Sequence, residues 1–493
     1  MPVFCAIVVA IVYAFSLDGD VGFWDTGELQ TVPYLPGLMH PTGYPAEILL
    51  GWLFTHVVPF GDPALRMTLF CALCVALAAG CCCAVGQLLG ARAEVAAGAS
   101  LCFAFTPVVW THATHADVTD PALAFCALTL LAGAYAVDRD EPRALYAAAV
   151  CAAFALGTHG TVVWFLPLPV LLVVMSGNVT LRRALPACAL LTVVLAAALY
   201  AYLPLRSAMV TAAHADPTRS LGIGSGKPFW DWGHPSTLSG FVDVVTGASV
   251  KSPQSLAAIL QPQGYPRDAA FLLGQLRDNF GRSFSYVVAA LALAGAWGSR
   301  PRALLLLPLL LVAPFAANFA AESDASRYFG FPFLCLWVLA GVGVSRLSGR
   351  VPNAAAVARV GALALVAVAG VEAYAGSALF GQRDDALGRT YIGDVLLASE
   401  PRAVLIAEWV YATPLAYAAY VEHAVGERIV VAGRAADYAR ELPGWTRTRP
   451  VYAIAESPPE VPVSVVLVRA LGVNPDAVHD PKLYRLGGPA HPR

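Results

Sequence analysis

Long apolar segments recur from the start of the chain to about residue 380. They begin near residues 2, 66, 95, 120, 144, 161, 184, 284, 303, 328 and 360. A helix needs about 20 mainly apolar residues to cross a bilayer. The pattern therefore predicts a mainly α, polytopic membrane protein with about eleven transmembrane helices in residues 1–380.

One apolar segment, residues 45–60, does not fit this series. It carries Glu47 and His56 and ends in Pro59 and Gly61. Counting it as a span would also break the distribution of charge along the chain. We therefore predict that it lies on the outer surface of the membrane as a helix.

Arginines mark one side of the predicted bundle. The short loops on that side contain Arg92, Arg139, Arg143, Arg182, Arg183, Arg300, Arg302, Arg346, Arg350 and Arg359. Loops rich in Lys and Arg stay in the cytoplasm, so the N-terminus is predicted to be cytoplasmic. The outer loops are then residues 18–64, 111–119, 205–283 and 322–327.

Residues 381–493 have a different pattern. Charges become frequent, and short β-rich runs begin at Val404, Ile429, Val451 and Val463. Helical stretches at 414–423 and 435–441 separate the first three runs. Alternating strands and helices predict a small α/β domain, which the charge pattern places outside the cytoplasm.

Composition agrees with this organisation. Apolar residues make up 58% of the 493 residues, charged residues 13%, and the mean hydropathy is +0.64. A soluble globular chain has about 25% charged residues. The net charge of −2 argues against nucleic-acid binding, which needs a basic surface. All eleven cysteines lie in apolar segments, so no disulfide framework is expected.

The first outer loop carries an acidic cluster beside lipid. Asp18, Asp20, Asp25 and Glu28 fall in one short stretch without Lys or Arg. Asp25 and Glu28 also have the spacing of a helix cap in which Glu28 closes a capping box. That interpretation does not explain the other two carboxylates. A carboxylate beside Trp24 and near lipid should have a raised pKa, which suits a general base.

The second outer loop holds His112, His115 and Asp117. Their spacing is compatible with a divalent metal. The same residues are also typical of a polar helix end, and we favour this over a metal. A catalytic or acceptor-binding role for Asp117 is the functional alternative that we prefer.

Two arginines, Arg206 and Arg327, lie at the outer ends of predicted spans, against the general charge bias. Such side chains often extend to lipid phosphates. Next to an acidic cluster they would instead form a site for a lipid-linked phosphate, since a guanidinium matches phosphate geometry.

Three motifs carry a resemblance to a known family. They are FWDTGELQTVPYLPGLMHPTGYPAEILLGWLF from residue 23, PLRS with DWGHPSTLSGF in the long outer loop, and ESDASRYFGFPFL from residue 322. Over roughly residues 1–350 the chain resembles the protein O-mannosyltransferase-like family (transmembrane protein 260 type) of the GT-C superfamily. These multi-span glycosyltransferases use polyprenyl-phosphate sugars and carry a catalytic Asp in the first outer loop, followed by a surface helix.

The resemblance, which covers Asp25, Glu28, His40 and Pro41, and the loop residues described above together give the expected site. Asp25 takes the position of the catalytic Asp, with Glu28 beside it. Substrate binding is expected at His40, Pro41, Tyr44, Asp117, Trp232 and His234, and binding of the donor phosphate at Arg206 and Arg327. Two departures are Thr42, where the family usually has Pro, and Asp117-Val118-Thr119, where it often has Glu-Val-Tyr.

The function that we predict is an inverting glycosyltransferase. It moves a sugar, mannose by the resemblance, from a polyprenyl-phosphate donor to a hydroxyl of an exported protein or glycan. A bacterial-type inner membrane is expected, and no metal is assigned, although a divalent ion is compatible with the acidic residues. The alternatives are a flippase for the lipid-linked sugar, for which Glu372 in the last span is the candidate carboxylate, and a non-catalytic scaffold.

Overall fold

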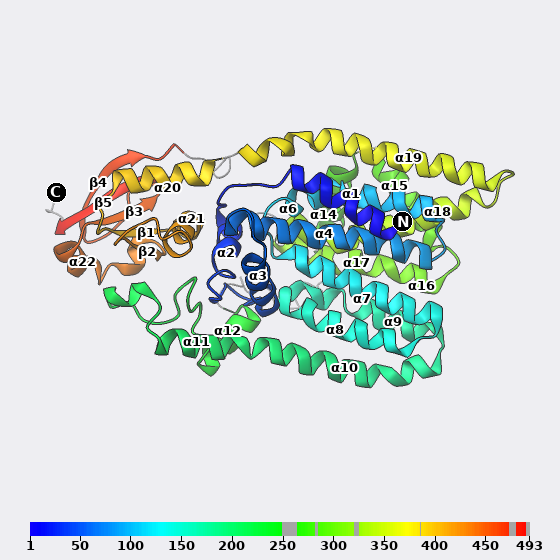
Figure 1. The fold of residues 1–493 in the computed structure, drawn as a ribbon, viewed down its shortest axis with the longest axis horizontal. Helices are drawn as coiled ribbons and strands as arrows, with labels where there is room; N and C mark the ends of the chain where they lie inside the picture. The colour runs from blue at the N-terminus through cyan, green and yellow to red at the C-terminus, as the bar shows by residue number, and fades with distance from the viewer. Residues whose placement is uncertain (249–263, 282–283, 320–324, 385, 473–479, 490–493) are drawn as a thin grey trace.

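The computed structural model describes residues 1–248, 264–281, 284–319, 325–384, 386–472 and 480–489. Parts of two predicted outer loops, 249–263 and 320–324, lie outside the described residues. Most of the described chain forms one elongated bundle of helices, with a small sheet at one end (Figure 1).

A helix begins near each of the eleven predicted starts. The bundle contains α1 (Pro2–Phe15), α4 (Pro63–Leu88), α5 (Ala93–Ala104), α6 (Pro107–Ala113), α7 (Thr119–Arg139), α8 (Pro142–Thr158), η1 (Gly160–Trp164), α9 (Pro167–Ser176), α10 (Val179–Tyr200), α14 (Tyr265–Phe280), α15 (Phe284–Ala296), α16 (Arg300–Ala303), η4 (Leu304–Leu306), α17 (Leu307–Phe319), η6 (Ala325–Phe329), α18 (Gly330–Ser348), α19 (Ala354–Ala375) and η7 (Gly376–Asp384). The local sequence explains several starts. Asp62 caps α4 by accepting from the Leu65 N–H at 2.8 Å, and Pro63 follows at the first helical position.

Six of these helical segments are long and apolar enough to cross a membrane, by length and composition. The bent pair of α5 and α6, with 66° between its halves, makes a seventh if it counts as one span. Four shorter apolar helices, of 10–17 residues, cover residues 2–15, 142–158, 160–176 and 284–296. The protein is therefore an integral membrane protein, and the count of eleven spans stays a prediction.

Between the bundle and the sheet lie the segments that carry the candidate chemistry (Figure 1). They include α2 (Trp24–Thr31) and α3 (Pro45–Val57), which is the predicted surface helix. From the long loop come α11 (Tyr202–Ala212), η2 (Pro217–Leu221) and α12 (Leu238–Thr246). An isolated β-bridge joins this loop to the first one, where the Leu38 N–H donates to the Phe229 carbonyl at 3.2 Å.

The remaining segment, which we call the sheet region, covers residues 387–489. It contains α20 (Leu387–Ala398), β1 (Val404–Ala407), α21 (Trp409–Tyr420), β2 (Ile429–Ala432), η8 (Ala435–Tyr438), α22 (Leu442–Thr448), β3 (Val451–Ala455), β4 (Val463–Ala470) and β5 (Lys482–Pro489). The strand order is β2-β1-β3-β5-β4, with the first three strands parallel and the last two pairings antiparallel. The predicted α/β pattern is confirmed for β1 to β4. The exact boundary at residue 380 stays a prediction.

The apolar cores show how the two parts join. One core fills the bundle. A second is shared, because Leu29 and Val32 of the first loop pack in the same cluster as Leu405, Tyr411 and other sheet residues. The loop with the acidic cluster is thus buried partly against the sheet region.

Candidate active site

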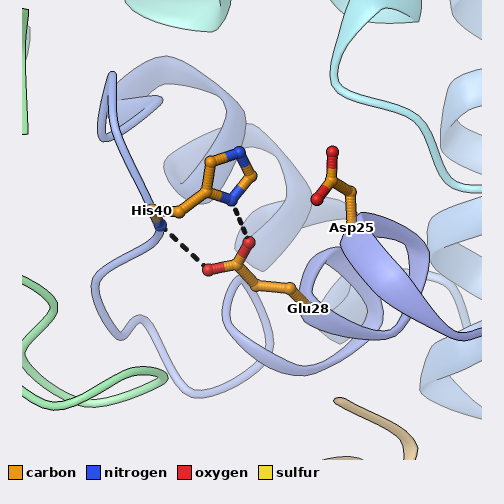
Figure 2. Close-up of side chains that lie close together, drawn as sticks. All are labelled: Asp25, Glu28 and His40. Carbon is orange, nitrogen blue, oxygen red and sulfur yellow. Dashed lines mark hydrogen bonds and ion pairs between the residues drawn. The ribbon is translucent and has the colours of Figure 1, made fainter. Parts of the chain in front are cut away.

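Glu28 is held by His40 and does not cap its own helix. α2 begins at Trp24, its N-cap is Phe23, and no side chain caps it. The predicted capping box is therefore wrong. Glu28 is fully buried, accepts the His40 backbone N–H at 2.9 Å, and pairs through its other oxygen with His40 Nδ1 (Figure 2). A buried carboxylate with this partner fixes the turn that follows α2.

His40 is placed to carry a positive charge. Its Nδ1 faces Glu28, and its Nε2 lies 3.0 Å from the Tyr44 hydroxyl, which itself donates to the Pro41 carbonyl at 2.8 Å. Both ring nitrogens thus face acceptors, as in an imidazolium. Burial lowers the pKa of His40, but the charges of Glu28 and Asp25 outweigh burial and raise this pKa to about 9.

Asp25 lies between two cations. Arg327 Nη1 is 3.1 Å from Asp25 Oδ2 and 3.8 Å from Asp117 Oδ2. Burial raises the pKa of Asp25, but His40 and Arg327 outweigh burial and hold it below its usual value. The predicted upward shift is therefore wrong in sign, because the sequence did not reveal the two cations. The side chains of Asp25 and Arg327 are 25% and 22% exposed, so a substrate can reach both.

The second outer loop supports Arg327. Asp117 accepts from His112 Nδ1 at 3.1 Å and from the backbone N–H and hydroxyl of Thr119, each at 2.7 Å. Burial raises the pKa of Asp117, but its hydrogen bond with His112 and the charges of His112 and Arg327 outweigh burial and hold this pKa well below its usual value. Asp117 therefore stays ionised. His115 instead pairs with Asp18 at 3.6 Å, so the three residues of the metal alternative do not converge.

In the part of the chain that the structure describes, one group has the geometry for a metal. The ligand atoms of Asp25, Glu28 and His40 lie within 4.8 Å of one another (Figure 2). The Nδ1 of His40 already faces Glu28, and a protonated ring offers no lone pair to an ion. A divalent cation would bind here only after His40 loses its proton.

The long loop contributes Trp232 but keeps His234 apart. The Trp232 and His40 rings are 6.0 Å apart, edge to face. His234 Nδ1 instead contacts Asp231 at 2.7 Å and the Ser207 hydroxyl at 3.3 Å. His234 thus anchors the loop through a buried carboxylate, and Trp232 is the motif residue that reaches the cluster.

Arg206 also differs from its predicted surroundings. Its guanidinium donates to the carbonyls of Pro36 and, at 3.2 Å, Leu35. These bonds attach the long loop to the first one. The structure therefore brings Arg327, and not Arg206, to Asp25; a phosphate contact at Arg206 stays a prediction.

Two aromatic residues beside the cluster were not predicted from the sequence. The His159 ring, in the turn between α8 and η1, stacks on Tyr44 at 5.6 Å. The Trp409 indole, at the start of α21, lies 6.4 Å from the His40 ring. A His between two apolar segments was a usable signal for His159. Trp409 gave none, since it lies almost 370 residues from His40 in the chain.

A small cavity of about 30 Å³ lies beside Arg327, with His112, Asp120 and Tyr328 among its lining residues. That volume holds about one water molecule. Within the described residues, the Nε of Arg327 and one carboxyl oxygen of Asp120 make no hydrogen bond. The Arg327 Nε–H is thus enclosed by protein without an acceptor among these residues.

The bundle, the surface helix and the loop-borne Asp define a polytopic membrane protein with the GT-C fold. Over 99% of both chains it resembles the apo structure of ArnT from Cupriavidus metallidurans, with 14% identity and a TM-score of 0.52. The Archaeoglobus fulgidus oligosaccharyltransferase, solved with Zn and sulfate, matches 92% of this chain and 68% of its own, with 14% identity and a TM-score of 0.50.

Residues 25–182 match the family model of the protein O-mannosyl-transferase TMEM260 N-terminal domain. The mouse protein O-mannosyl-transferase TMEM260 is 28% identical over 245 residues, which are 48% of this chain and 32% of the mouse protein. The Dictyostelium discoideum protein is 39% identical over 49 residues, 10% of this chain and 6% of its own. The resemblance to this family is thereby confirmed. The matched part spans about a third of the mouse relative's length.

Proposed function

We propose that this protein is an inverting glycosyltransferase that moves a mannose from a polyprenyl-phosphate donor to a hydroxyl. The acceptor hydroxyl belongs to Ser or Thr of an exported protein. The observation that carries the proposal is the position of Asp25. This carboxylate is partly exposed, lies 3.1 Å from Arg327, and begins the segment that matches the TMEM260 family.

The reaction needs one base. Asp25 takes the proton of the acceptor hydroxyl while the acceptor oxygen attacks the anomeric carbon of the donor. The bond from that carbon to the phosphate oxygen breaks, and polyprenyl phosphate leaves with the electron pair. A phosphate leaves without a proton, so the second carboxylic acid of a glycosidase is not required.

Arg327 receives the phosphate in this mechanism. Its guanidinium is fixed by Asp25 and Asp117, and the side chain stays partly exposed beside Asp25. Arginine forms charge-assisted bonds with phosphate. When a phosphate shares the charge of Arg327, Asp25 loses part of the stabilisation of its ionised form. Donor binding therefore makes Asp25 a stronger base.

The other residues of the cluster orient the reactants. His40 carries a positive charge near Asp25, and Glu28 fixes His40 through two contacts. Tyr44 and Pro41 fix the second ring nitrogen. These groups are also close enough to bind sugar hydroxyls. The mechanism has no step that needs a metal, and we expect a chelator to leave the rate unchanged.

We place this reaction on the outer face of a bacterial-type plasma membrane, with the N-terminus in the cytoplasm. The support is the arginine-rich loops, because α9–α10 and α18–α19 connect at the end of the bundle opposite the sheet region (Figure 1).

The distribution of buried carboxylates favours an interfacial enzyme over a flippase. A transporter places such groups near the middle of the membrane. Among the described residues, the buried ones lie in or directly beside the predicted outer loops: Asp20, Glu28, Glu47, Asp117, Asp120, Asp231 and Asp268.

The test is transfer from radiolabelled polyprenyl-phosphate mannose in proteoliposomes with envelope extract as acceptor. We expect Asp25→Asn to lose transfer by at least about a hundredfold, the usual share of a general base. Asp138→Asn is the matched control, because Asp138 ends α7 next to Arg139 at the distant end of the bundle. Full activity of Asp25→Asn overturns the assignment. Movement of the donor across the bilayer without acceptor supports the flippase alternative.

A further inference from the structure

The sheet region reaches the candidate site through one aromatic side chain. Trp409 is the first residue of α21 and lies two residues beyond the end of β1. The strand order β2-β1-β3 carries the chain from one side of β1 to the other. In open α/β sheets, ligands bind outside the carboxyl ends of the strands at such a switch point. Trp409 thus occupies the edge of the sheet at which a ligand site is expected.

Two tryptophans meet at a right angle beside His40. The indoles of Trp232 and Trp409 are 4.6 Å apart with 88° between their planes. The His40 ring lies 6.0 Å from the first and 6.4 Å from the second, and Phe229 stacks on Trp409 at 5.4 Å. Both indoles are only partly buried. The long loop and the sheet region therefore form an aromatic corner, partly exposed, next to the polar cluster.

Close packing fixes this corner relative to Asp25. α2 and α21 lie against each other so tightly that a side-chain carbon on Gly27 would come within 2.9 Å of Thr413. The same helix α2 carries Asp25, and the same helix α21 carries Trp409. The separation of the two functional side chains is therefore set by two rigid elements in direct contact.

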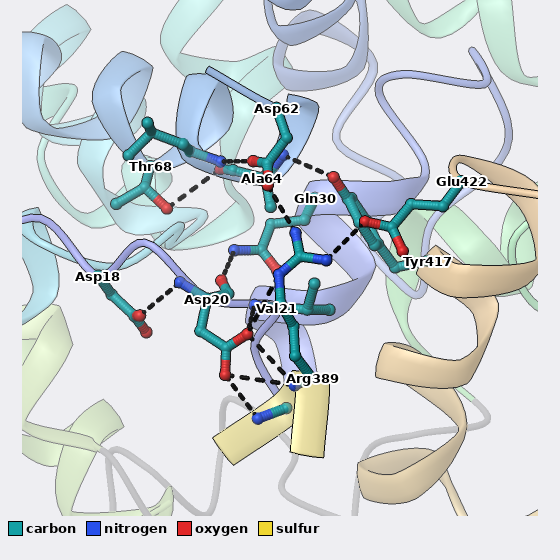
Figure 3. A network of polar contacts seen from close by, with 12 residues as sticks. Asp18, Asp20, Val21, Gln30, Asp62, Ala64, Thr68, Arg389, Tyr417 and Glu422 are labelled. Atoms are coloured by element: carbon teal, nitrogen blue, oxygen red, sulfur yellow. Dashed lines mark hydrogen bonds and ion pairs between the residues drawn. The ribbon is translucent and has the colours of Figure 1, made fainter. Parts of the chain in front are cut away.

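A polar network also attaches the sheet region to the first loop (Figure 3). Asp20 accepts from the backbone N–H of Gly388 at 2.6 Å and of Arg389 at 3.2 Å, at the start of α20. The Arg389 side chain bridges Asp62 at 2.6 Å and Glu422 at 2.8 Å. Burial raises the pKa of Asp20, against the effect of these N–H groups. Three segments far apart in sequence are thus joined beside the site.

We propose that Trp409 and Trp232 form the binding surface for a pyranose ring, so that the sheet region completes the substrate site. This rests on the proposed transfer of a sugar. An indole has a negative face, and the C–H groups on one side of a pyranose are weakly positive, so the two stack. The hydroxyls at the ring edge would then meet His40 and its neighbours. The ring belongs either to the donor or to a glycan on the acceptor.

The test measures KM for each substrate with the full-length protein in proteoliposomes. We expect Trp409→Ala to raise one KM about tenfold, which corresponds to about 1.4 kcal/mol. Trp409→Phe, which keeps an aromatic face, should stay within about threefold of the wild type. A change in the donor KM assigns the ring to the donor sugar, and a change in the acceptor KM assigns it to an acceptor glycan.

Trp445→Ala is the control for loosening of the sheet. Trp445 is buried against Tyr438 in the core that α22 and η8 form with the strands, separate from the core that contains Tyr411 of α21. The inference is overturned if Trp409→Ala leaves both KM values unchanged. It is also overturned if Trp445→Ala raises KM as much as Trp409→Ala does. If Trp409→Ala does not fold, fluorescence provides the test: the sugar-lipid should quench the wild type, and Trp409→Phe should lose the share of this quenching that Trp409 contributes. Quenching equal to that of the wild type in Trp409→Phe overturns the inference.

Failure here is distinguishable from failure of the proposed function. Inactive Asp25→Asn with unchanged KM values in Trp409→Ala removes the sugar site alone. Active Asp25→Asn removes the proposed mechanism whatever Trp409 does.

Discussion

The charge on His40 controls the acidity of Asp25, and replacing His40 by Gln tests this directly. The closest ligand atoms of the two side chains lie within 4.8 Å. At an effective dielectric constant of about 20, a pair of unit charges at that distance is worth about 3.5 kcal/mol. One pKa unit corresponds to about 1.36 kcal/mol, so before solvent screening the loss of the imidazolium would move the acid limb by about 2.5 pH units or more. Asp25 is 25% exposed, which screens the interaction, and we expect about one to two units.

The assay is the pH dependence of kcat/KM, whose acid limb reports the base of the free enzyme. In the wild type, the pKa of Asp25 lies below its usual value, so the rate should be flat down to about pH 4. Without the imidazolium, the acid limb of His40→Gln moves up by about one to two units. The wild type should also show an inflection near pH 9, from the pKa of His40.

His56→Gln is the matched control for this experiment. His56 lies in the same first loop, but its ring contacts the Trp52 carbonyl at 2.8 Å and no carboxylate among the described residues. Its acid limb should coincide with that of the wild type. An unmoved acid limb in active His40→Gln would refute the conclusion that His40 depresses the pKa of Asp25.

Three further predictions concern groups around the site. The pKa of His40 is raised in the folded protein to about 9, so its pairing with Glu28 contributes its full stabilisation below about pH 6.5. Up to about 3 kcal/mol of the free energy of unfolding is lost as the pH rises through 9. A melting temperature that is flat from pH 6.5 to 9.5 contradicts this. Asp20→Asn weakens the hydrogen bonds to the backbone at the start of α20 and should lower the free energy of unfolding by about 1–3 kcal/mol. We expect a lower melting temperature and faster proteolysis between α19 and α20. Unchanged cleavage argues against an anchoring role. Burial strongly raises the pKa of Glu47, whose carboxyl oxygens have no partner among the described residues. Glu47→Gln should therefore change the free energy of unfolding by less than about 1 kcal/mol. A large drop in the melting temperature would show that the carboxylate is charged.

Local patterns predicted the helices and most of the strands. Apolar runs bounded by Pro, Gly and Arg located the start of a helix near each of the eleven predicted positions, because burial in lipid requires uninterrupted apolar sequence. β1 to β4 followed from short runs of β-branched residues. β5 was missed, since Lys482 to Pro489 carries two glycines and is a strand only because β3 and β4 pair with it.

The beginning of α21 was placed at Pro414, although the helix starts five residues earlier at Trp409. A proline normally opens a helix, and here it lies within one. Because of this error, Trp409 was not predicted to belong to the site. The carboxylates and arginines of the site were found from sequence, but their pairing was not, because Asp25 and Arg327 are 302 residues apart.

The contact between α2 and α21 has a consequence for the order of events during synthesis. Asp25 is synthesised early, whereas Arg327, Trp409 and Thr413 follow some 300 to 390 residues later. Until those segments arrive, Asp25 lacks its guanidinium partner and Gly27 lacks the helix that covers it. The growing chain therefore holds an incomplete site. The site is complete only once the sheet region has docked against α2.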